Sequence, residues 1–561
     1  MIKPRLLTFG VILFSLSWLL TDHYHPWTSF HSEALAFFAV CVLLISCLLN
    51  QGLEILIPRI TAWIIFTGAL IWLQYAIGTI FFAGDALLSS FYLSGFLFAI
   101  VFGSGLMQGG MAGSSRDWLW LIHATWFAAL ISAAIGLAQW LNVQDRLGIY
   151  AWQTAPGARA AGNLGQSNQL ATFLLMGIAS LVSVHEKRGI SKVVLTFAVA
   201  FMTFVLALTQ SRAGMVSAGV AGAFLLWKQN SIMLRLPRAA VWWWLACFMA
   251  ATLGLPSLSQ ILMLGDVRSL TATESVSERW LIWKQVSYAI AQAPWFGYGW
   301  NQTPTANAVG ASAFPGSTTY TNAHNIVLDL MVWCGIPLGL LLTGLMAYWG
   351  FSRMRAVKQP QAILAMAALL PIAVHSLLEF PFAYAYFLIS AGFFVGIVEA
   401  SHVPSRSVAI KTRWLWAVLG IWAGLGGYMA YEYLQIEEDF RIVRFENLRV
   451  GATPASYEAP HVWMLSHMAA MLKAARQVPK PDMPRADLEN LRKVSDRFAY
   501  GAIRFKYAQA LGLNGDPAGA TRQMQIIHGM YGDFFYKACK DELARLTVDK
   551  YPQLAQIKVS D

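Results

Sequence analysis

The chain has 561 residues, of which 57% are hydrophobic and 12% charged, and its mean hydropathy of +0.51 excludes an ordinary soluble protein. The composition predicts an all-α protein that crosses a membrane many times. The net charge of +11 includes no compact basic run interleaved with aromatic residues, so we expect no nucleic-acid partner. Four of the five cysteines fall in apolar runs, which supports neither disulfides nor a cysteine-ligated metal.

Thirteen apolar runs are predicted to be transmembrane helices. The first follows Lys3 and Arg5 without a small-residue cleavage site, so we expect a retained helix and not a removed signal peptide. The runs cover residues 7–21, 34–49, 60–82, 86–107, 118–141, 168–184, 193–209, 213–227, 239–262, 324–350, 361–378, 382–400 and 414–434.

Lysine and arginine are distributed unevenly between alternate loops. If the N-terminus is cytoplasmic, the inner loops carry sixteen of these residues and the outer loops, longer in total, carry six. This pattern follows the positive-inside rule. An odd helix count places the chain after Leu434 outside, so we expect a membrane domain over residues 1–434 and a soluble outer helical domain over 435–561.

The loop after the first run holds three histidines and a carboxylate, His23, His25, His31 and Glu33. Such a set invites a metal-site hypothesis. The proline and tryptophan between them favour an ordered interfacial loop instead, and we expect no metal site.

The outer loop 142–167 and the turn after the seventh run contain two candidate anion-binding arginines. Arg159 begins a segment through Gln169 whose glycines allow close backbone packing while Arg159, Gln166 and Asn168 face outward. This arrangement suits an anionic head group, and the alternative is an interfacial cap with an anchoring arginine. Arg212 lies in a tight turn, where a phosphate contact and snorkelling to the interface both explain it.

The outer loop 263–323 leads to the strongest catalytic candidate. Arg279 begins an amphipathic, tryptophan-containing segment, which fits either an anion contact or a surface-lying helix with a solvated arginine. His324 follows the loop, and its neutral imidazole can accept a hydroxyl proton near pH 7. Asn325 can hydrogen-bond a sugar or phosphate oxygen, and Asp329 lies about one helical turn beyond it. The alternative is that His324 caps the following helix.

A fourth outer group consists of His375, Glu379, Tyr384 and Tyr386. His375 and Glu379 are four residues apart, so a local ion pair on one helix would also explain them. That pair would explain these two residues without any function, and otherwise we expect the group to contact a substrate or to support the other candidates.

The tail after residue 434 loses the membrane composition. Residues 498–527 show two amphipathic helical patterns joined by a Gly- and Pro-containing segment at 512–517. This resembles a single tetratricopeptide-like hairpin. A domain that docks a partner and an appendage that only stabilises the chain both fit the pattern.

These motifs resemble the O-antigen ligase and polymerase superfamily, and more closely its PglL-type branch of bacterial protein O-oligosaccharyltransferases. The resemblance covers most of the membrane region and depends on the order of the motifs and their common outer side. The motifs are His25–Glu33, Arg159–Gln169, Gln210–Gly214, Pro294–Gly299, His324-Asn325 and His375–Tyr386.

The resemblance implies a GT-C-like fold in the bacterial inner membrane, with a periplasmic active site and tail. It implies transfer of a preassembled glycan from undecaprenyl diphosphate to Ser or Thr of an exported protein such as pilin. His324 would be the base, Arg159, Arg212 and Arg279 would stabilise the diphosphate, and Gln166, Asn168 and Asn325 would bind the donor. Family members also need a Gln and a Tyr, which correspond to Gln166 and to either Tyr384 or Tyr386.

Neither a cofactor nor a metal is expected, because the sequence has no phosphate-binding loop and no paired acidic motif in the large outer loop. Two alternatives remain within the superfamily, ligation of polysaccharide to lipid A-core and chain polymerisation. A transporter of lipid-linked glycans is a third, but the sequence shows no internal repeat and no array of charges within helix centres.

Overall fold

The computed structural model describes residues 2–49, 52–107, 117–230, 232, 234–264, 274–401, 407–454 and 456–559. Helices dominate these residues, as the composition predicts. The expectation of an all-α membrane protein fits these residues, and the described chain adds one short antiparallel pair, β1 (Glu54–Pro58) and β2 (Ser407–Lys411), with Leu56 opposite Ala409. Two five-residue strands so far apart in the chain leave no local pairing signal.

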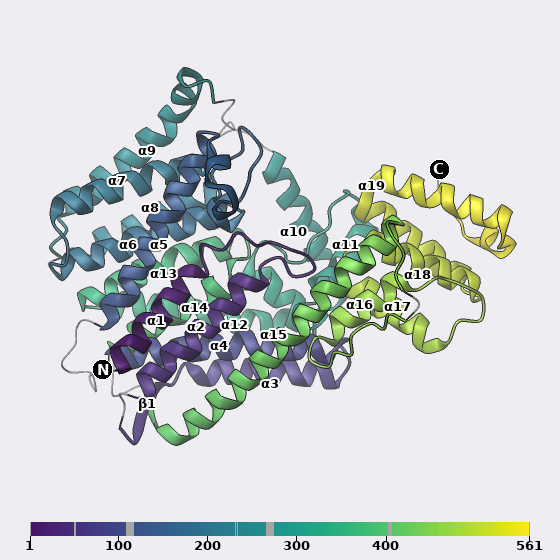
Figure 1. Ribbon diagram of the computed structural model, residues 1–561, viewed down its shortest axis with the longest axis horizontal. Helices are drawn as coiled ribbons and strands as arrows, with labels where there is room; N and C mark the ends of the chain where they lie inside the picture. The colour runs from purple at the N-terminus through teal and green to yellow at the C-terminus, as the bar shows by residue number, and fades with distance from the viewer. Residues whose placement is uncertain are drawn as a thin grey trace. The chain divides into compact units, whose positions relative to one another are not determined.

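Each of the thirteen predicted runs coincides with a helix (Figure 1). Their bounds are α1 (Ile2–Leu16), α2 (Phe30–Leu48), α3 (Thr61–Ala76), α4 (Ala83–Met107), α5 (Asp117–Trp140), α6 (Ser167–Glu186), α7 (Lys192–Leu208), α8 (Arg212–Lys228), α9 (Arg238–Ile261), α12 (Ile326–Ala356), α13 (Pro360–Ser376), α14 (Ala385–Ala400) and α15 (Thr412–Leu448). In the described ranges six helices are long and apolar enough to cross a membrane, namely α2, α4, α5, α6, α9 and α12. The chain is therefore a multi-pass membrane protein, and the count of thirteen spans stays a prediction.

Side-chain caps fix where several helices begin. Ser191 precedes α7, Ser211 precedes α8, and Asp516 precedes α19 (Pro517–Asp549). Each side chain accepts a hydrogen bond from the backbone N–H three residues later, at 3.2, 2.9 and 2.7 Å respectively. The first N–H groups of a helix have no partner within it, so these caps stabilise the observed starts.

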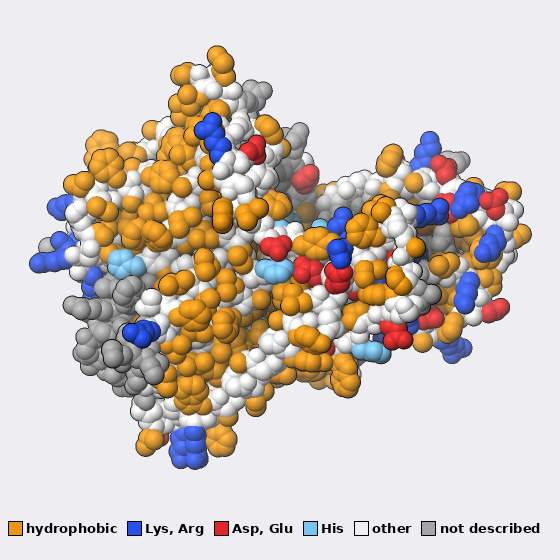
Figure 2. Space-filling model, in the orientation of Figure 1, with side chains coloured by type: hydrophobic (Ala, Val, Ile, Leu, Met, Phe, Trp, Pro, Cys, Tyr) orange, Lys and Arg blue, Asp and Glu red, His pale blue; other side chains and the backbone are white. Residues whose placement is uncertain are grey.

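The described chain forms two compact units, and the first comprises Met1–Phe66, Phe91–Ala272 and Tyr348–Gly426. Here α6 is buried almost throughout and packs against α5, α7, α8 and α13. Trp18, after α1, stacks on Phe173 of α6 with ring centroids 4.0 Å apart. In Figure 2 hydrophobic side chains cover much of the visible face of α7 to α9, as lipid contact requires.

The second unit comprises Thr67–Ser90, Thr273–Ala347 and Gly427–Asp561. Met524, Ile527 and Tyr536 of α19 belong to its hydrophobic core. The face over its C-terminal helices mixes acidic and basic side chains (Figure 2). Besides α19, the helices that lie wholly within it are α10 (Glu274–Gln292), α11 (Thr303–Ala313), α16 (Ser466–Arg476), α17 (Arg485–Arg497), α18 (Gly501–Leu513) and the short η4 (Pro552–Gln556).

Within the second unit, α11 packs against α17 and α19. The Gly529 carbonyl of α19 accepts the N–H groups of Gly316 and Ser317 at 3.1 and 3.0 Å. A Cβ at Gly529 would lie 2.3 Å from the Ala311 carbonyl oxygen, so this close approach requires glycine. The tail is therefore tied to the segment that leads toward His324.

The polar regions contain more regular structure than the sequence predicts. The loop 142–167 includes short 3-10 helices, η1 (Gln144–Tyr150) and η2 (Gly162–Leu164), and the loop 263–323 includes α10 and α11. Residues 265–273 of that loop lie outside the described residues. The helical hairpin predicted at 498–527 is confirmed as α18 and α19, while the domain boundary after residue 434 stays a prediction.

Candidate active site

A buried amide in the first unit links three of the predicted motifs. Asn168, in the first turn of α6, donates from Nδ2 to Glu379 Oε1 at 3.0 Å. The Asn168 Oδ1 atom accepts the Ser211 hydroxyl at 2.8 Å, and Ser211 is the N-cap of α8. All three side chains are buried. One amide therefore joins the beginnings of α6 and α8 to the turn that follows α13.

A second chain of hydrogen bonds extends from the next residue of α6. Gln169 donates to Gln166 Oε1 at 2.8 Å and accepts the Tyr386 hydroxyl at 3.0 Å. Tyr384 stacks on Tyr386 with ring centroids 5.6 Å apart and is only partly buried.

The other two members of the fourth group also have partners on α6. His375 is buried, and its Nδ1 atom lies 2.8 Å from the Thr172 hydroxyl oxygen. Glu379 accepts from Asn168, as described above. A local pair on one helix is thus not needed to explain these two residues, because α6 supplies a polar side chain for each.

Glu33 is a buried carboxylate that connects further elements of the same unit. Its Oε2 atom accepts from Trp27 Nε1 at 3.0 Å and from the Tyr92 hydroxyl, and its Oε1 atom accepts the Ala385 N–H at 3.4 Å. The side chain is 1% exposed. The sequence placed Glu33 in a histidine-containing loop, whereas the structure places it in a network between α2, α4 and α14.

The early histidine loop is ordered by backbone contacts. His23 Nε2 lies 2.8 Å from the Asn163 carbonyl oxygen, and His23 Nδ1 lies 3.2 Å from the Thr28 carbonyl oxygen. The ring also contacts Trp152 edge to face. Among the residues that the structure describes, no group of three or more His, Cys, Asp or Glu could hold a metal ion. These contacts support the interpretation of an ordered loop.

The segment that carries Arg159 is fixed by buried amides. Gln139 Oε1 accepts the N–H groups of Ala161 and Gly162 at 3.0 and 2.8 Å. Asn163 donates to the Leu19 carbonyl at 2.7 Å. Gly162 has a φ of +60°, a backbone conformation that residues other than glycine rarely adopt. Arg159 is thus a partly exposed side chain on a rigid loop.

Arg212 lies on the same side of the first unit as Arg159. The Ala160 N–H, next to Arg159, donates to the Leu208 carbonyl at the end of α7, at 3.4 Å. After a short turn, Arg212 is the first residue of α8 and is partly exposed. The positive end of the helix dipole adds to its guanidinium charge. The structure therefore brings the segments that carry the two arginines together within the first unit.

In the second unit, the turn before α12 holds His324 in an uncommon conformation, with φ +54°. Asn325 is the cap of α12, because its Oδ1 accepts the N–H groups of residues 327 and 328 at 2.9 and 3.3 Å. The next residue back, His324, is partly exposed. The structure thus assigns the cap to the neighbouring amide.

Buried groups hold the peptide next to His324 from two sides. Asp329 Oδ1 accepts the Ala323 N–H and the Thr303 hydroxyl, each at 2.9 Å. The Ala323 carbonyl accepts Trp283 Nε1 of α10 at 3.1 Å. Asp329 is fully buried. The backbone that carries His324 is consequently fixed, which a catalytic base requires.

Arg279 lies on the helix that contacts this turn. It precedes Trp283 by four residues, so the two side chains share one face of α10. Lys284, on the same helix, lies over the Phe314 ring at 4.2 Å. The amphipathic helix predicted at Arg279 is confirmed, and the structure places that helix beside the His324 turn.

The Pro294–Gly299 motif packs against a break inside α12. Gly335 has a φ of +78° and interrupts the helix, and a Cβ there would lie 2.4 Å from the Trp295 backbone. The Ile336 N–H donates to the Pro294 carbonyl, and the Tyr298 N–H donates to the carbonyl of residue 332, both at 2.7 Å. The motif thus has a structural role in clamping the two halves of α12.

The candidate residues are divided between the units. The first unit contains Arg159, Gln166, Asn168, Arg212, His375, Glu379, Tyr384 and Tyr386, and the second contains Arg279, His324 and Asn325. Sequence reasoning missed several supporting residues, because their partners are far away along the chain. These are Tyr92, Gln169, Thr172, Ser211 and Thr303.

Three family models match successive parts of the chain. Residues 160–182 match "Protein glycosylation ligase", residues 197–343 match "O-Antigen ligase", and residues 363–544 match "Virulence factor membrane-bound polymerase, C-terminal". The chain is 30% identical over 550 residues to a general O-oligosaccharyltransferase of Acinetobacter baylyi, covering 94% of this chain and 92% of the relative. It is 26% identical over 411 residues to a ComP-specific O-oligosaccharyltransferase of the same organism, covering 72% and 73%.

Proposed function

The chain belongs to the bacterial O-oligosaccharyltransferase family, and from this membership we propose that it transfers a preassembled glycan from undecaprenyl diphosphate to Ser or Thr hydroxyls of exported proteins. The protein is a glycosyltransferase of protein O-glycosylation. The observation that carries this conclusion is the near full-length match to a general O-oligosaccharyltransferase. Pilin is one candidate acceptor from the resemblance of the sequence motifs, and the second relative is named for a single target, ComP.

The proposed reaction is a direct displacement at the anomeric carbon. The acceptor hydroxyl oxygen forms the new glycosidic bond, the bond from the anomeric carbon to the diphosphate oxygen breaks, and the diphosphate leaves with the electron pair. His324 takes the hydroxyl proton, and its partly exposed, backbone-fixed position supports this role. A single displacement inverts the configuration at that carbon.

Fixed cations stabilise the diphosphate as its negative charge develops. We assign this role to Arg159, Arg212 and Arg279. The rigid segment at Arg159 and the helix start at Arg212 support the assignment, because neither needs to reorganise during the reaction.

The amides and aromatic residues have supporting roles in this proposal. Gln166 presents its amide to the glycan or diphosphate while Gln169 holds it. Asn168 and Asn325 act mainly by positioning, because Asn168 bridges Glu379 and Ser211 and Asn325 caps α12. Tyr384 is the better of the two tyrosine candidates for contact with substrate, because its side chain is partly exposed whereas Tyr386 is buried.

The O-antigen ligase alternative has one specific observation in its favour, the family match over residues 197–343. This match covers a shared part of the superfamily, whereas the oligosaccharyltransferase relative covers 94% of the chain. We therefore retain lipid A-core ligation only as the second candidate function.

The proposal places the protein in the bacterial inner membrane with thirteen spans and a cytoplasmic N-terminus. The uneven distribution of lysine and arginine between alternate loops supports this topology. In this arrangement the candidate active site and the domain after residue 434 are periplasmic.

The decisive experiment measures glycan transfer by purified protein from undecaprenyl diphosphate-linked oligosaccharide to a Ser-containing acceptor, without added nucleotide or metal. Wild type should form product, and His324→Ala should lower kcat by about 10²- to 10⁴-fold, the usual contribution of a general base. His528→Ala is the matched control, because His528 is an exposed histidine on α19 of the same unit.

Transfer by wild type only to lipid A-core would replace the proposed function with the second candidate. Equal rates for His324→Ala and His528→Ala would remove His324 from the reaction while leaving the family assignment intact. No transfer to either acceptor would contradict the proposed donor.

A further inference from the structure

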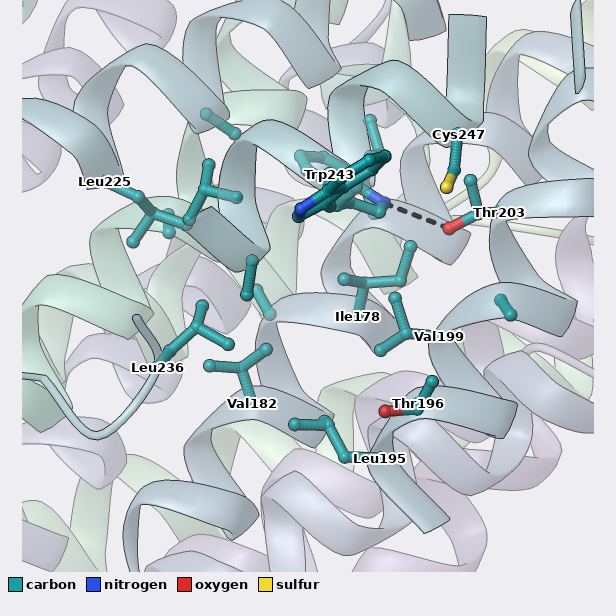
Figure 3. Close-up of a pocket in the computed structure, with 18 of the residues that line it drawn as sticks. Ile178, Val182, Leu195, Thr196, Val199, Thr203, Leu225, Leu236, Trp243 and Cys247 are labelled. Carbon is teal, nitrogen blue, oxygen red and sulfur yellow. Dashed lines mark hydrogen bonds between the residues drawn. The ribbon is translucent and has the colours of Figure 1, made fainter. Parts of the chain in front are cut away.

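The first unit contains an apolar cavity that the proposed reaction does not use. Helices α6 to α9, with a contribution from α13, enclose a volume of about 460 Å³ (Figure 3). This lies within the range of small-ligand sites. The lining residues Val182 of α6 and Leu225 of α8 lie near the ends of these helices. These two residues lie toward the ends of α6 and α8 that are opposite to Asn168 and Arg212, while the lining extends along α7 as far as Phe204.

The lining can bind hydrocarbon but has little to offer a polar head group. Its two hydroxyl groups are already engaged, since Thr203 accepts Trp244 Nε1 at 2.9 Å and Thr196 donates to the Lys192 carbonyl at 2.9 Å. Figure 3 shows aliphatic side chains and the Trp243 ring around the space. A buried, unpaired polar group would be costly in such a lining, so the occupant must present an apolar chain.

Basic side chains surround one end of this cavity. Lys192 begins α7 and lies one turn before the lining residue Thr196, on the same helix face. Arg238 begins α9, one turn before the lining residue Val241. Both basic side chains are exposed. Because helical side chains point toward the helix N-terminus, both project past the cavity toward this end.

The loop between α8 and α9 orders this basic end. Glu186, the last residue of α6, accepts the N–H groups of Arg235 and Leu236 at 2.9 Å each. Arg235 Nη1 donates to the His185 carbonyl at 2.9 Å. One carboxylate is thus present, but it is engaged by two backbone donors. Exposed Lys187, Arg188 and Arg235 keep the end positively charged.

Exposed tryptophans indicate that this end lies at the surface of the bilayer. Trp242 and Trp243, in the first turns of α9, are 61% and 71% exposed. Tryptophan is enriched where the hydrocarbon meets the head groups, and lysine and arginine extend into the head-group layer. The cavity therefore opens at the depth where a lipid phosphate and its acyl chain diverge.

We propose that this cavity binds one anionic phospholipid, with an acyl chain between α6, α7 and α9 and its phosphate on Lys192 and Arg238. The apolar lining selects a hydrocarbon chain, and the basic rim selects a negative head group. The donor's polyprenyl tail is the less suitable occupant, because its diphosphate is assigned to arginines at the other ends of the helices. In the proposed topology the lipid comes from the cytoplasmic leaflet.

The test measures lipid retention by native mass spectrometry of the full-length protein in detergent with added phosphatidylglycerol or phosphatidylcholine. Wild type should retain one phosphatidylglycerol in preference to phosphatidylcholine. Lys192→Gln should weaken retention by about fivefold, the effect of one basic residue near a head group. Lys411→Gln is the matched control, because Lys411 is an exposed lysine of the same unit on β2, away from the cavity lining.

A second pair of variants tests the cavity itself. Ala200→Phe places a ring at an exposed lining position and should abolish retention, whereas Ala198→Phe changes the same helix at a position outside the lining and should not. The proposal is overturned if wild type does not prefer the anionic lipid. It is also overturned if Lys192→Gln retains lipid as well as Lys411→Gln, or if Ala200→Phe retains lipid as well as Ala198→Phe. Displacement of the bound phospholipid by undecaprenyl phosphate would instead assign the cavity to the donor tail. None of these readouts depends on glycan transfer.

Discussion

Acidification should weaken the attachment of α16 to the start of α4, because His467 is buried as a neutral ring. The ring lies parallel to Phe498, close to Asp85 and Arg497, which form an ion pair at 2.8 Å. Next to it, the Ser466 hydroxyl accepts the Gly84 N–H at 3.0 Å. These contacts all lie within the second unit and connect its tail segment to α4.

The size of the effect follows from two pKa values. Burial lowers the pKa of His467 to about 4, from 6.5 for an unperturbed histidine. Between these values the unfolded chain binds a proton that the folded chain does not, so stability is lost as pH falls from 6.5 to 4. The difference corresponds to about 3 kcal/mol at the acid end of this range.

Hydrogen exchange of α16 in the purified full-length protein measures this loss. Between pH 7 and pH 4.5, after correction for intrinsic exchange rates, wild-type protection should fall by on the order of a hundredfold. His467→Gln should lack this component, because glutamine does not titrate. His461→Gln is the control, since His461 is exposed in the same segment and its replacement should preserve the wild-type response.

The reasoning fails if wild type and His467→Gln lose protection equally over this pH range. It also fails if His461→Gln removes the acid response, because the titrating group would then be an exposed one. A loss confined to wild type and His461→Gln is the expected pattern.

Substitutions at Asn168, Asn325 and Gly335 test further contacts of the two units. Asn168→Leu should lower the unfolding free energy by about 2–4 kcal/mol in denaturant titrations, because Glu379 and Ser211 each lose a buried partner; a value matching that of a surface substitution would contradict this. Asn325→Ala should cost about 1 kcal/mol through loss of the α12 cap, and Asn325→Asp should recover most of it. Gly335→Ala should lower the melting temperature and the folded yield, because φ is +78° and the added Cβ would lie 2.4 Å from backbone atoms. Gly344→Ala is the control and should change neither, because a Cβ at Gly344 has no atom within 4 Å.

Apolar length was sufficient to predict the helices of the membrane region. Every run from 7–21 to 414–434 overlaps an observed helix, because a stretch of apolar residues in lipid must satisfy its backbone internally. The criterion of apolar length missed α11, because its alanine, threonine and asparagine residues form no long apolar run. The apolar run 414–434 also did not indicate that its helix is longer than the run, since α15 continues to Leu448 with polar residues.

The chemistry of the candidate residues was easier to predict than their partners. Arg159, Arg212 and His324 stood out because charged or titratable groups are rare beside apolar runs. Their supports did not, because contacts such as Thr172 with His375 join positions about 200 residues apart. Asn325 shows a further limit, since a polar residue before a helix can serve as a cap or as a ligand and sequence does not distinguish them.

The Gly529 carbonyl of α19, which binds the backbone at 316 and 317, affects how this enzyme can be engineered. An exchange of the tail alone between two relatives would pair a foreign α19 with the native segment 303–320. Steric fit at Gly529 and Ala311 leaves little tolerance for such a mismatch. Chimeras that carry 303–320 together with 501–549 preserve that fit, so we expect them to fold where an exchange of the tail alone does not.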